Sequence, residues 1–331
     1  MCDKYVLGID TSNYRTSIAL VNQDGKIACD ERLLLKVKKG ERGLRQSEAL
    51  FQHVENLPVL FERLPSDKVK ISAVAVSTRP RPVEGSYMPC FKAGYGFGKA
   101  VAKALDVPFY EYSHQEGHIE AIRANTDIGG EKPFLAWHLS GGTCELLKVN
   151  KLVFDKEAEE QTDIEIIGGS KDISFGQVID RIGVLLGMSF PAGEEMDALA
   201  ENACKINTKY KKILTKIKTD GLWFNLSGIE TQGSRACEGL DESDVEVLVL
   251  EIFDKIADTI IKVTEEAANI YDIKDVIFAG GVSCSKYISK KLIKTFEKSR
   301  LNIQFGLQTL SGDNAVGIAL LGGKAYGNET R

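Results

Sequence analysis

Short apolar runs alternate with polar turns along much of the chain. They occupy residues 5–9, 16–21, 69–77, 107–111, 134–139, 144–149 and 276–282. Apolar runs of this length, bounded by turn residues, are typical of buried β-strands. An Asp-Gly turn at 24–25 separates the second run from a further strand that starts at 26–30, so the chain opens with a hairpin and a third strand.

Helical periodicity marks other stretches. Apolar positions recur every three or four residues at Leu50, Phe51, Val54 and Leu57, so we expect a helix at 47–60. Residues 90–105 predict a second helix whose small residues would permit close packing or close approach of a ligand. A third helix is expected at 285–298, just after a glycine pair, where the N–H groups of a helix N-terminus could meet an anion.

The combination of a strand, a small polar turn and a second strand occurs twice, at 10–17 and at 139–143, and a third glycine turn lies at Gly280-Gly281. This duplication resembles the actin/hexokinase-like (ASKHA) fold, an α/β fold in which two related lobes face each other across a nucleotide cleft. We expect an N-terminal lobe at 1–110 and a C-terminal lobe at 111–331, with the last helix packing back on the N-terminal lobe.

Two of the four histidines, His114 and His118, stand four residues apart. On a helix they share one face and could hold a divalent metal while leaving positions open. Gln115 occupies the place of the general base of a zinc peptidase helix, which makes a peptidase a weak hypothesis. An isolated pair with this spacing is as often two surface histidines as a metal site.

Composition limits the classes of function. The 331 residues are 43% hydrophobic and 27% charged, as in ordinary globular proteins, and allow two lobes with separate cores. No stretch approaches the roughly 18 apolar residues of a membrane span, and the start of the chain leads directly into a strand, so we expect a cytoplasmic protein without membrane contact. The seven cysteines are scattered and form no C-x-x-C pair, which predicts reduced thiols.

The net charge of −5 means that a nucleic acid could be bound only through local basic patches. Basic residues gather at 36–45, 205–218 and 286–300. Each of these segments, taken alone, is more simply explained as a solvated loop or helix face.

Several motifs together resemble the tRNA threonylcarbamoyladenosine transferase family, TsaD, formerly described as O-sialoglycoprotein endopeptidase or Gcp. The His-Gln-Glu-Gly-His stretch is similar to the family's H-x-E-G-H metal motif, and 311–315 is similar to its C-T-D-N-A. The resemblance implies iron(II) or zinc held by His114, His118 and Asp313. It implies substrate or nucleotide contacts at Ser12, Leu139, Ser140, Gly141, Gly142, Thr143, Asp180, Gly193, Gly280, Gly281 and Ser285.

The chain departs from the family pattern at the expected site. The first turn reads Asn13-Tyr14-Arg15 where the family has two acidic residues, and Arg15 could bind an anion directly. Thr143 replaces a family histidine, a loss for which His138 could compensate if it faces the cleft; a core histidine bonded to backbone is the commoner outcome. A glycine-rich family loop is replaced by 80–83, with two prolines. Arg15 and His138 are therefore the catalytic candidates.

The resemblance implies transfer of a threonylcarbamoyl group from threonylcarbamoyl-AMP to N6 of the adenosine next to the anticodon of tRNA. It implies an adenine nucleotide, with ATP as a further ligand, and a partner protein or dimer formed through the N-terminal lobe. Two alternatives remain open. One is a regulatory, non-catalytic nucleotide-binding paralogue, and the other is a related carbamoyltransferase with a different acceptor.

Overall fold

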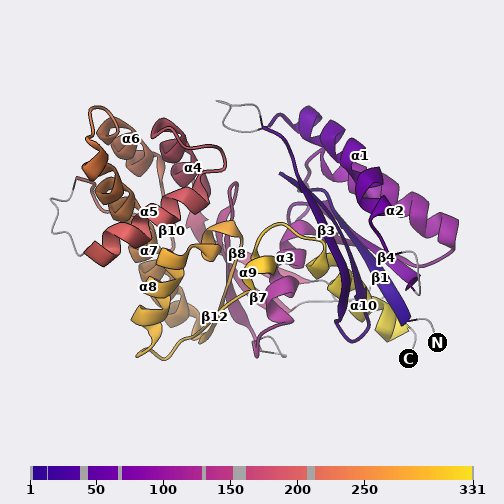
Figure 1. Ribbon diagram of the computed structural model, residues 1–331. Helices are drawn as coiled ribbons and strands as arrows, with labels where there is room; N and C mark the ends of the chain where they lie inside the picture. Colours follow the sequence, from indigo (N-terminus) through magenta and orange to yellow (C-terminus); the bar gives the residue numbers. More distant parts are fainter. Residues whose placement is uncertain are drawn as a thin grey trace.

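The computed structural model describes residues 3–12, 14–37, 44–65, 69–128, 132–151, 162–206 and 213–329. Figure 1 shows two sheets beside each other, each flanked by helices. The first sheet has the order β3-β2-β1-β4-β5 and consists of β1 (Asp3–Asp10), β2 (Arg15–Asn22), β3 (Ile27–Leu34), β4 (Val69–Arg79) and β5 (Phe109–Ser113). The expected boundary after residue 110 falls inside β5, which pairs with β4 up to Ser113.

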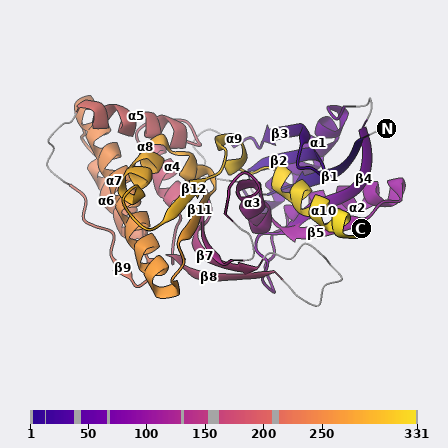
Figure 2. The same ribbon diagram turned by 90° about the horizontal axis from the view of Figure 1, so that it is seen from below.

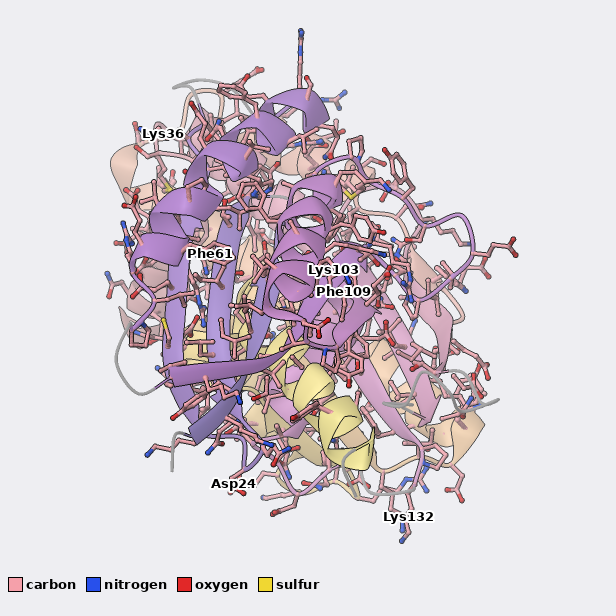
Figure 3. All side chains as sticks on the ribbon, turned by 90° about the vertical axis from the view of Figure 1, so that its right-hand side faces the viewer. Asp24, Lys36, Phe61, Lys103, Phe109 and Lys132 are labelled. Atoms are coloured by element: carbon pink, nitrogen blue, oxygen red, sulfur yellow. The ribbon has the colours of Figure 1, made fainter. Side chains whose placement is uncertain are left out.

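Both faces of the first sheet are buried, which explains the continuous apolar runs of β1 and β4. Leu7 and Ile9 pack against α1 (Gln46–Glu62) and α2 (Phe91–Leu105), while Val6 and its neighbours face α10 (Val316–Glu329). Figure 3 shows α1 and α2 side by side over the sheet, near the labelled Phe61 and Lys103. The last helix, α10, thus lies on the sheet of the N-terminal lobe.

The small residues of α2 serve close packing. A Cβ on Gly98 would lie 2.4 Å from Val76 Cγ1, and one on Gly94 would lie 2.9 Å from Thr11 Oγ1. The helix can approach the sheet this closely only because these side chains are absent. Of the two roles considered for the small residues, close packing is therefore the one observed.

The second sheet has the order β12-β11-β6-β7-β8-β10-β9. Its strands are β6 (Phe134–Leu139), β7 (Cys144–Lys151), β8 (Asp163–Ser170), β9 (Thr219–Asp220), β10 (Trp223–Phe224), β11 (Asp275–Ala279) and β12 (Asn302–Phe305). The core order β8-β7-β6-β11-β12 repeats that of the first sheet, β3-β2-β1-β4-β5, with the same antiparallel and parallel pairings. The predicted duplicated α/β fold is confirmed.

Helices cover both faces of the second sheet. One face carries the main core cluster, formed with α4 (Phe175–Leu185), α5 (Gly193–Ile206), α6 (Ser227–Ala236), α7 (Glu242–Tyr271) and α8 (Lys286–Phe296). The other face packs on α3 (His114–Arg123), which also contacts α10, so α3 lies between the two sheets in Figures 1 and 2. The histidine motif therefore sits at the junction of the lobes.

Other sequence predictions are resolved as follows. The helices expected at 47–60, 90–105 and 285–298 are α1, α2 and α8. Residues 207–212 of one basic segment and 38–43 of another lie outside the described residues, and 213–218 are not helical. The described cysteines are all free thiols. Among the helices of the described ranges, none combines the length and apolar character needed to cross a membrane.

Candidate metal centre and adjoining cleft

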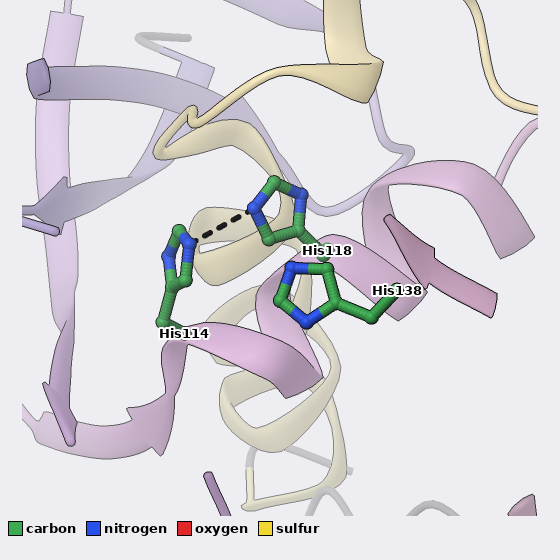
Figure 4. A group of neighbouring side chains, drawn as sticks. All are labelled: His114, His118 and His138. Carbon is green, nitrogen blue, oxygen red and sulfur yellow. Dashed lines mark hydrogen bonds between the residues drawn. The ribbon is translucent and has the colours of Figure 1, made fainter. Parts of the chain in front are cut away.

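The histidine pair is held by a well-capped helix. Ser113 ends β5 and caps α3: its hydroxyl accepts from the Glu116 N–H, and the Glu116 carboxylate accepts from the Ser113 N–H. Both histidines then lie on one face of α3, and their Nε2 atoms are 2.9 Å apart (Figure 4). Gln115 points elsewhere, because its Nε2 donates to Glu145. The glutamate of the motif is thus a capping residue.

Asp313 reaches the pair from the loop between α9 (Gln308–Ser311) and α10. Its Oδ1 lies 3.2 Å from His118 Nε2 and 3.4 Å from His114 Nε2. Asn314 shapes this loop by donating to the Leu310 and Gly312 carbonyls and accepting from the Val316 N–H. Three atoms with these separations can all lie about 2.0–2.1 Å from one ion, the usual length of zinc bonds to nitrogen and oxygen. The residues therefore fit a divalent metal.

Asp10 is a member of the site that the sequence reasoning missed. This fully buried carboxylate, at the end of β1, lies 3.0 Å from His114 Nδ1 and accepts from the hydroxyls of Ser12 and Ser77. A carboxylate that accepts from the second nitrogen of a ligand histidine fixes its tautomer and orientation. The signal in the sequence was a lone acidic residue ending an apolar strand.

Electrostatics also mark the cluster as a cation site. Burial alone would lower the pKa of His114, but the carboxylates of Asp10 and Asp313 outweigh it and raise that pKa to about 10. Burial and the neighbouring His114 lower the pKa of His118. The two carboxylates, one fully buried and one partly buried, therefore favour positive charge at this point, either a proton on His114 or a bound metal ion.

His138, on β6, faces the same cluster. Ligand atoms of the three histidines all lie within 4.8 Å of one another, and its ring stands beside that of His118 in Figure 4. Within the described part of the chain, neither ring nitrogen has a hydrogen-bond partner, so His138 is not the backbone-bonded core histidine considered above. Burial holds its pKa well below the ordinary value, so the ring is neutral.

A cavity of about 490 Å³ opens beside the histidines. It is lined by Ser12, Tyr14, Pro80, Arg81, Ser86, Tyr87, Met88, Phe91, His114, His138, Ser140, Gly141, Gly142, Thr143 and Asp313. A second cavity shares Tyr14 and Gly141 with it and is lined further by Gln177, Asp180, Arg181, Val184 and Phe190. The two cavities adjoin each other between the histidine cluster and α4, and together they are called the cleft below.

The predicted substrate loop lines this cleft from Ser140 to Thr143. The Ser140 hydroxyl accepts from the N–H groups of Gly142 and Thr143, at 3.3 and 3.0 Å, which holds the turn. Leu139 does not line either cavity. A Cβ on Gly280, whose φ is +93°, would lie 2.4 Å from the Leu139 carbonyl oxygen, so the Gly280-Gly281 turn packs directly behind the loop.

The other predicted nucleotide residues divide into two groups. Asp180 lines the smaller cavity and accepts from the Ala192 N–H, next to Gly193 at the start of α5. Ser285 caps α8 and donates its hydroxyl to Asp197, away from both cavities. The assignment of Gly193, Gly280-Gly281 and Ser285 to the nucleotide stays a prediction.

The substituted residues lie around the same cleft. Arg15 donates to the Asp313 backbone carbonyl at 3.4 Å and so holds the loop that carries Asp313. Tyr14 packs edge-on against Phe190, with ring centroids 5.7 Å apart. Arg81, which the sequence reasoning did not single out, lines the larger cavity and pairs with Glu145. Arg81 belongs to residues 80–83, the segment with two prolines that departs from the family pattern.

Comparisons with solved structures agree with this fold. HypF from T. kodakarensis superposes with a TM-score of 0.57 at 15% identity, over 99% of this chain and 48% of that chain, so the chain spans about half of HypF. Component A of the (R)-2-hydroxyglutaryl-CoA dehydratase from Acidaminococcus fermentans gives a TM-score of 0.54 at 14% identity, with 99% of each chain covered. These likenesses concern the ASKHA fold alone.

Sequence comparisons reach further. The family model for tRNA N6-adenosine threonylcarbamoyltransferase, TsaD, matches residues 36–320. The chain is 26% identical to the tRNA N6-adenosine threonylcarbamoyltransferase of Thermosipho africanus, over 97% of this chain and 94% of that protein. It is 28% identical to the enzyme of that name from Streptococcus pneumoniae, over 96% of this chain and 91% of the relative. The chain therefore belongs to the TsaD family.

Proposed function

We propose that this protein transfers a threonylcarbamoyl group from threonylcarbamoyl-AMP to N6 of the adenosine next to the anticodon in tRNA. The observation that carries the proposal is the convergence of His114, His118 and Asp313, with separations of 2.9–3.4 Å, beside a cavity of about 490 Å³ that His114 and Asp313 line. Family membership supplies the reaction, and the cleft supplies room for an acyl donor beside the ligands.

The site residues have separate roles in this transfer reaction. His114, His118 and Asp313 hold iron(II) or zinc, which when bound supplies a Lewis acid and a template for the acyl donor. Arg81 pairs with Glu145 but has further N–H donors for an anionic group of the donor in the same cavity. The N6 amine forms the new C–N bond to the carbamoyl carbon as the C–O bond to AMP breaks. AMP leaves with that electron pair, and N6 releases a proton to solvent in the cleft.

The nucleotide half of the donor is assigned to the α4 side of the cleft. Asp180 lines the smaller cavity there, and Gly193, Gly280-Gly281 and Ser285 follow from the resemblance. Tyr14 and Gly141 line both cavities, so they stand where the acyl and nucleotide halves of the donor would meet. Positioning of a reactive anhydride against its acceptor is a large part of such catalysis.

Ion pairs occupy part of the basic surface that this chain could offer to tRNA. On α8, Lys290 pairs with Glu201 and Lys291 pairs with Asp258, so much of that basic segment is already neutralised. The outer side of α1 exposes Phe51, Val54 and Val59, at 61%, 43% and 42%. We propose that a partner protein or a second copy covers this part of the N-terminal lobe and contributes to the RNA contact in the cytoplasm.

Complementation tests the proposal. The chain is expressed in cells that lack their own threonylcarbamoyl transferase, and the modified nucleoside is measured in hydrolysed tRNA. Rescue by the wild type, and none by His114→Ala, is expected. A protein that binds metal but restores no modified nucleoside, even when it is expressed together with its partner protein, would contradict the assigned reaction.

A second candidate is a regulatory, non-catalytic paralogue. The observation in its favour is the first turn, after β1. There Arg15 donates a hydrogen bond to the Asp313 carbonyl, and Tyr14 packs on Phe190. This candidate predicts binding of ATP or AMP, measured calorimetrically, with no transfer in the presence of any partner. Full rescue by the chain alone would exclude it. A carbamoyltransferase with another acceptor amine would consume the donor while leaving tRNA unmodified.

A further inference from the structure

His138 is the histidine of the cluster that the family motifs do not account for. It comes from β6 of the second sheet, whereas His114 and His118 begin α3, directly after β5 of the first sheet. We propose that His138 is a further protein ligand of the metal, so that the chain holds the ion with three imidazole nitrogens and the carboxylate of Asp313. This inference rests on the metal site of the proposed function.

The His138 ring lies close to the other two histidines. Ring centroids of His138 and His118 are 4.9 Å apart, and those of His138 and His114 are 6.2 Å apart. Ligand atoms of the three histidines lie within 4.8 Å of one another. In a tetrahedral zinc site two nitrogen ligands lie roughly 3.4 Å apart, so the His138 nitrogen must move toward the other ligands by about 1.4 Å at most. A rotation of the His138 side chain would supply this movement.

In the described part of the structure, the two ring nitrogens of His138 lack the hydrogen bonds that buried polar atoms normally have. Both ring nitrogens of His138 are buried and lack a hydrogen-bond partner among the residues that the structure describes. Burying a polar group without a partner is costly, so a histidine placed here needs a reason. A metal ion would give one of these buried nitrogens the partner that it lacks within the described ranges. A proton carrier would instead need a polar group to orient its ring.

The extra ligand changes what the site can do. Three nitrogens and one carboxylate oxygen fill the four positions that zinc takes in closed sites, whereas iron(II) with the same ligands keeps positions open. Zinc with these ligands would have to expand its coordination to meet the acyl donor, whereas iron(II) would not. Thr143 and His138 lie on either side of the Ser140–Gly142 turn. The chain lacks the family histidine at Thr143, which is partly exposed, and has an imidazole at the buried His138 instead.

The first test needs no variant. The wild-type protein is loaded with one equivalent of zinc, and X-ray absorption at the zinc edge counts the imidazoles from their multiple scattering. Three histidines are expected. A spectrum fitted by two histidines would overturn the inference while leaving the site of His114, His118 and Asp313 in place.

Variants give an independent measure. Chelator competition is expected to show that His138→Leu lowers the affinity for zinc at least about 100-fold, the upper end of the loss seen when a mere partner of a ligand is removed. Thr143→Val, which alters the same cavity without removing a ligand, serves as the control and should keep wild-type affinity; circular dichroism checks the fold of both. Wild-type affinity in His138→Leu, with affinity lost in His114→Ala, would refute the role of His138 alone. Wild-type affinity in His114→Ala would refute the proposed metal site itself.

Discussion

At the scale of single residues, Asp10 determines how His114 presents its Nε2 atom. Its carboxylate lies 3.0 Å from His114 Nδ1 and is itself held by Ser12 and Ser77. We expect Asp10→Asn to weaken zinc or iron binding by roughly 10- to 100-fold, the usual effect of losing such a partner. Competition with a chelator measures this. Ser77→Ala, which removes one bond to Asp10, should cause a smaller loss; equal affinity in wild type and Asp10→Asn would contradict the role.

His53 gives a prediction of pH dependence away from the metal. It is fully buried in α1, with Nδ1 2.8 Å from the Thr16 hydroxyl, and burial lowers its pKa from 6.5 to about 4. The unfolded chain therefore binds the proton more readily, and stability is lost as pH falls from 6.5 toward about 4. The full loss is on the order of 3 kcal/mol.

Urea unfolding over that pH range tests the role of His53. His53→Gln, which cannot titrate, should show a flatter decline of the free energy of unfolding with falling pH than the wild type. Parallel curves for the two proteins would show that other groups cause the decline.

Some residues of the candidate site were predictable from the sequence and others were not. His114, His118 and Asp313 were proposed as one site because a family motif joins them, and the structure brings their ligand atoms together. Asp10 and Arg81 were missed because nothing in their local sequence shows which side chains they meet. The contacts Asp10–His114 and Arg81–Glu145 join residues far apart in the chain, so they depend on the sheet topology.

At the scale of elements, the packing of α3 against α10 depends on facing glycines. A Cβ on Gly317 would lie 1.9 Å from the Gly117 carbonyl oxygen, and one on Gly117 would lie 2.7 Å from Ile318 Cδ1. We expect Gly317→Ala to destabilise the protein by about 1–3 kcal/mol or more, because the backbones must separate. Gly117→Ala should cost less, since the end of a side chain can move.

Gly96 in α2 provides a matched control, because a Cβ there would meet nothing within 4 Å. Gly96→Ala should be neutral or stabilising by up to about 1 kcal/mol, the difference in helix propensity. Thermal unfolding of the variants measures the contrast. If Gly317→Ala were as stable as Gly96→Ala, the close approach of the two helices would be wrong.

Strands and short amphipathic helices were the elements best predicted. The buried runs of β1, β4, β6 and β11 have no polar alternation, since helices cover both faces of each sheet. The long helix α7 was not among our predictions, although its buried Leu248, Ile252, Ile256 and Ile260 recur every four residues. The two-residue strands β9 and β10 have no sequence signal, because pairing with β8 and with each other alone defines them.

At the scale of the whole molecule, the duplicated architecture was predictable because the strand–turn–strand pattern occurs twice in the sequence. The division of the chain into lobes was less predictable from the sequence. The last helix, α10, packs on β1 and β4 of the first sheet, and α3 contacts elements of both sheets, so these two helices join parts of the chain that lie far apart in sequence. Such long-range packing follows from how the two sheets share helices, which local pattern does not encode.

The proposed metal site joins the two lobes, which gives the last prediction. Asp10 ends β1 of the first sheet, His138 lies on β6 of the second, and His114, His118 and Asp313 lie between them. A ligand that binds only the folded state stabilises it by about 2.7 kcal/mol at a hundred times its Kd. In a protein of this size that corresponds to a fall in Tm of roughly 5 °C when the metal is removed. Calorimetry with and without a chelator should show this fall in the wild type and no chelator effect in His118→Ala. An unchanged wild-type Tm, in a preparation shown to have held metal, would mean that the ion does not contribute to the stability of the two-lobe structure.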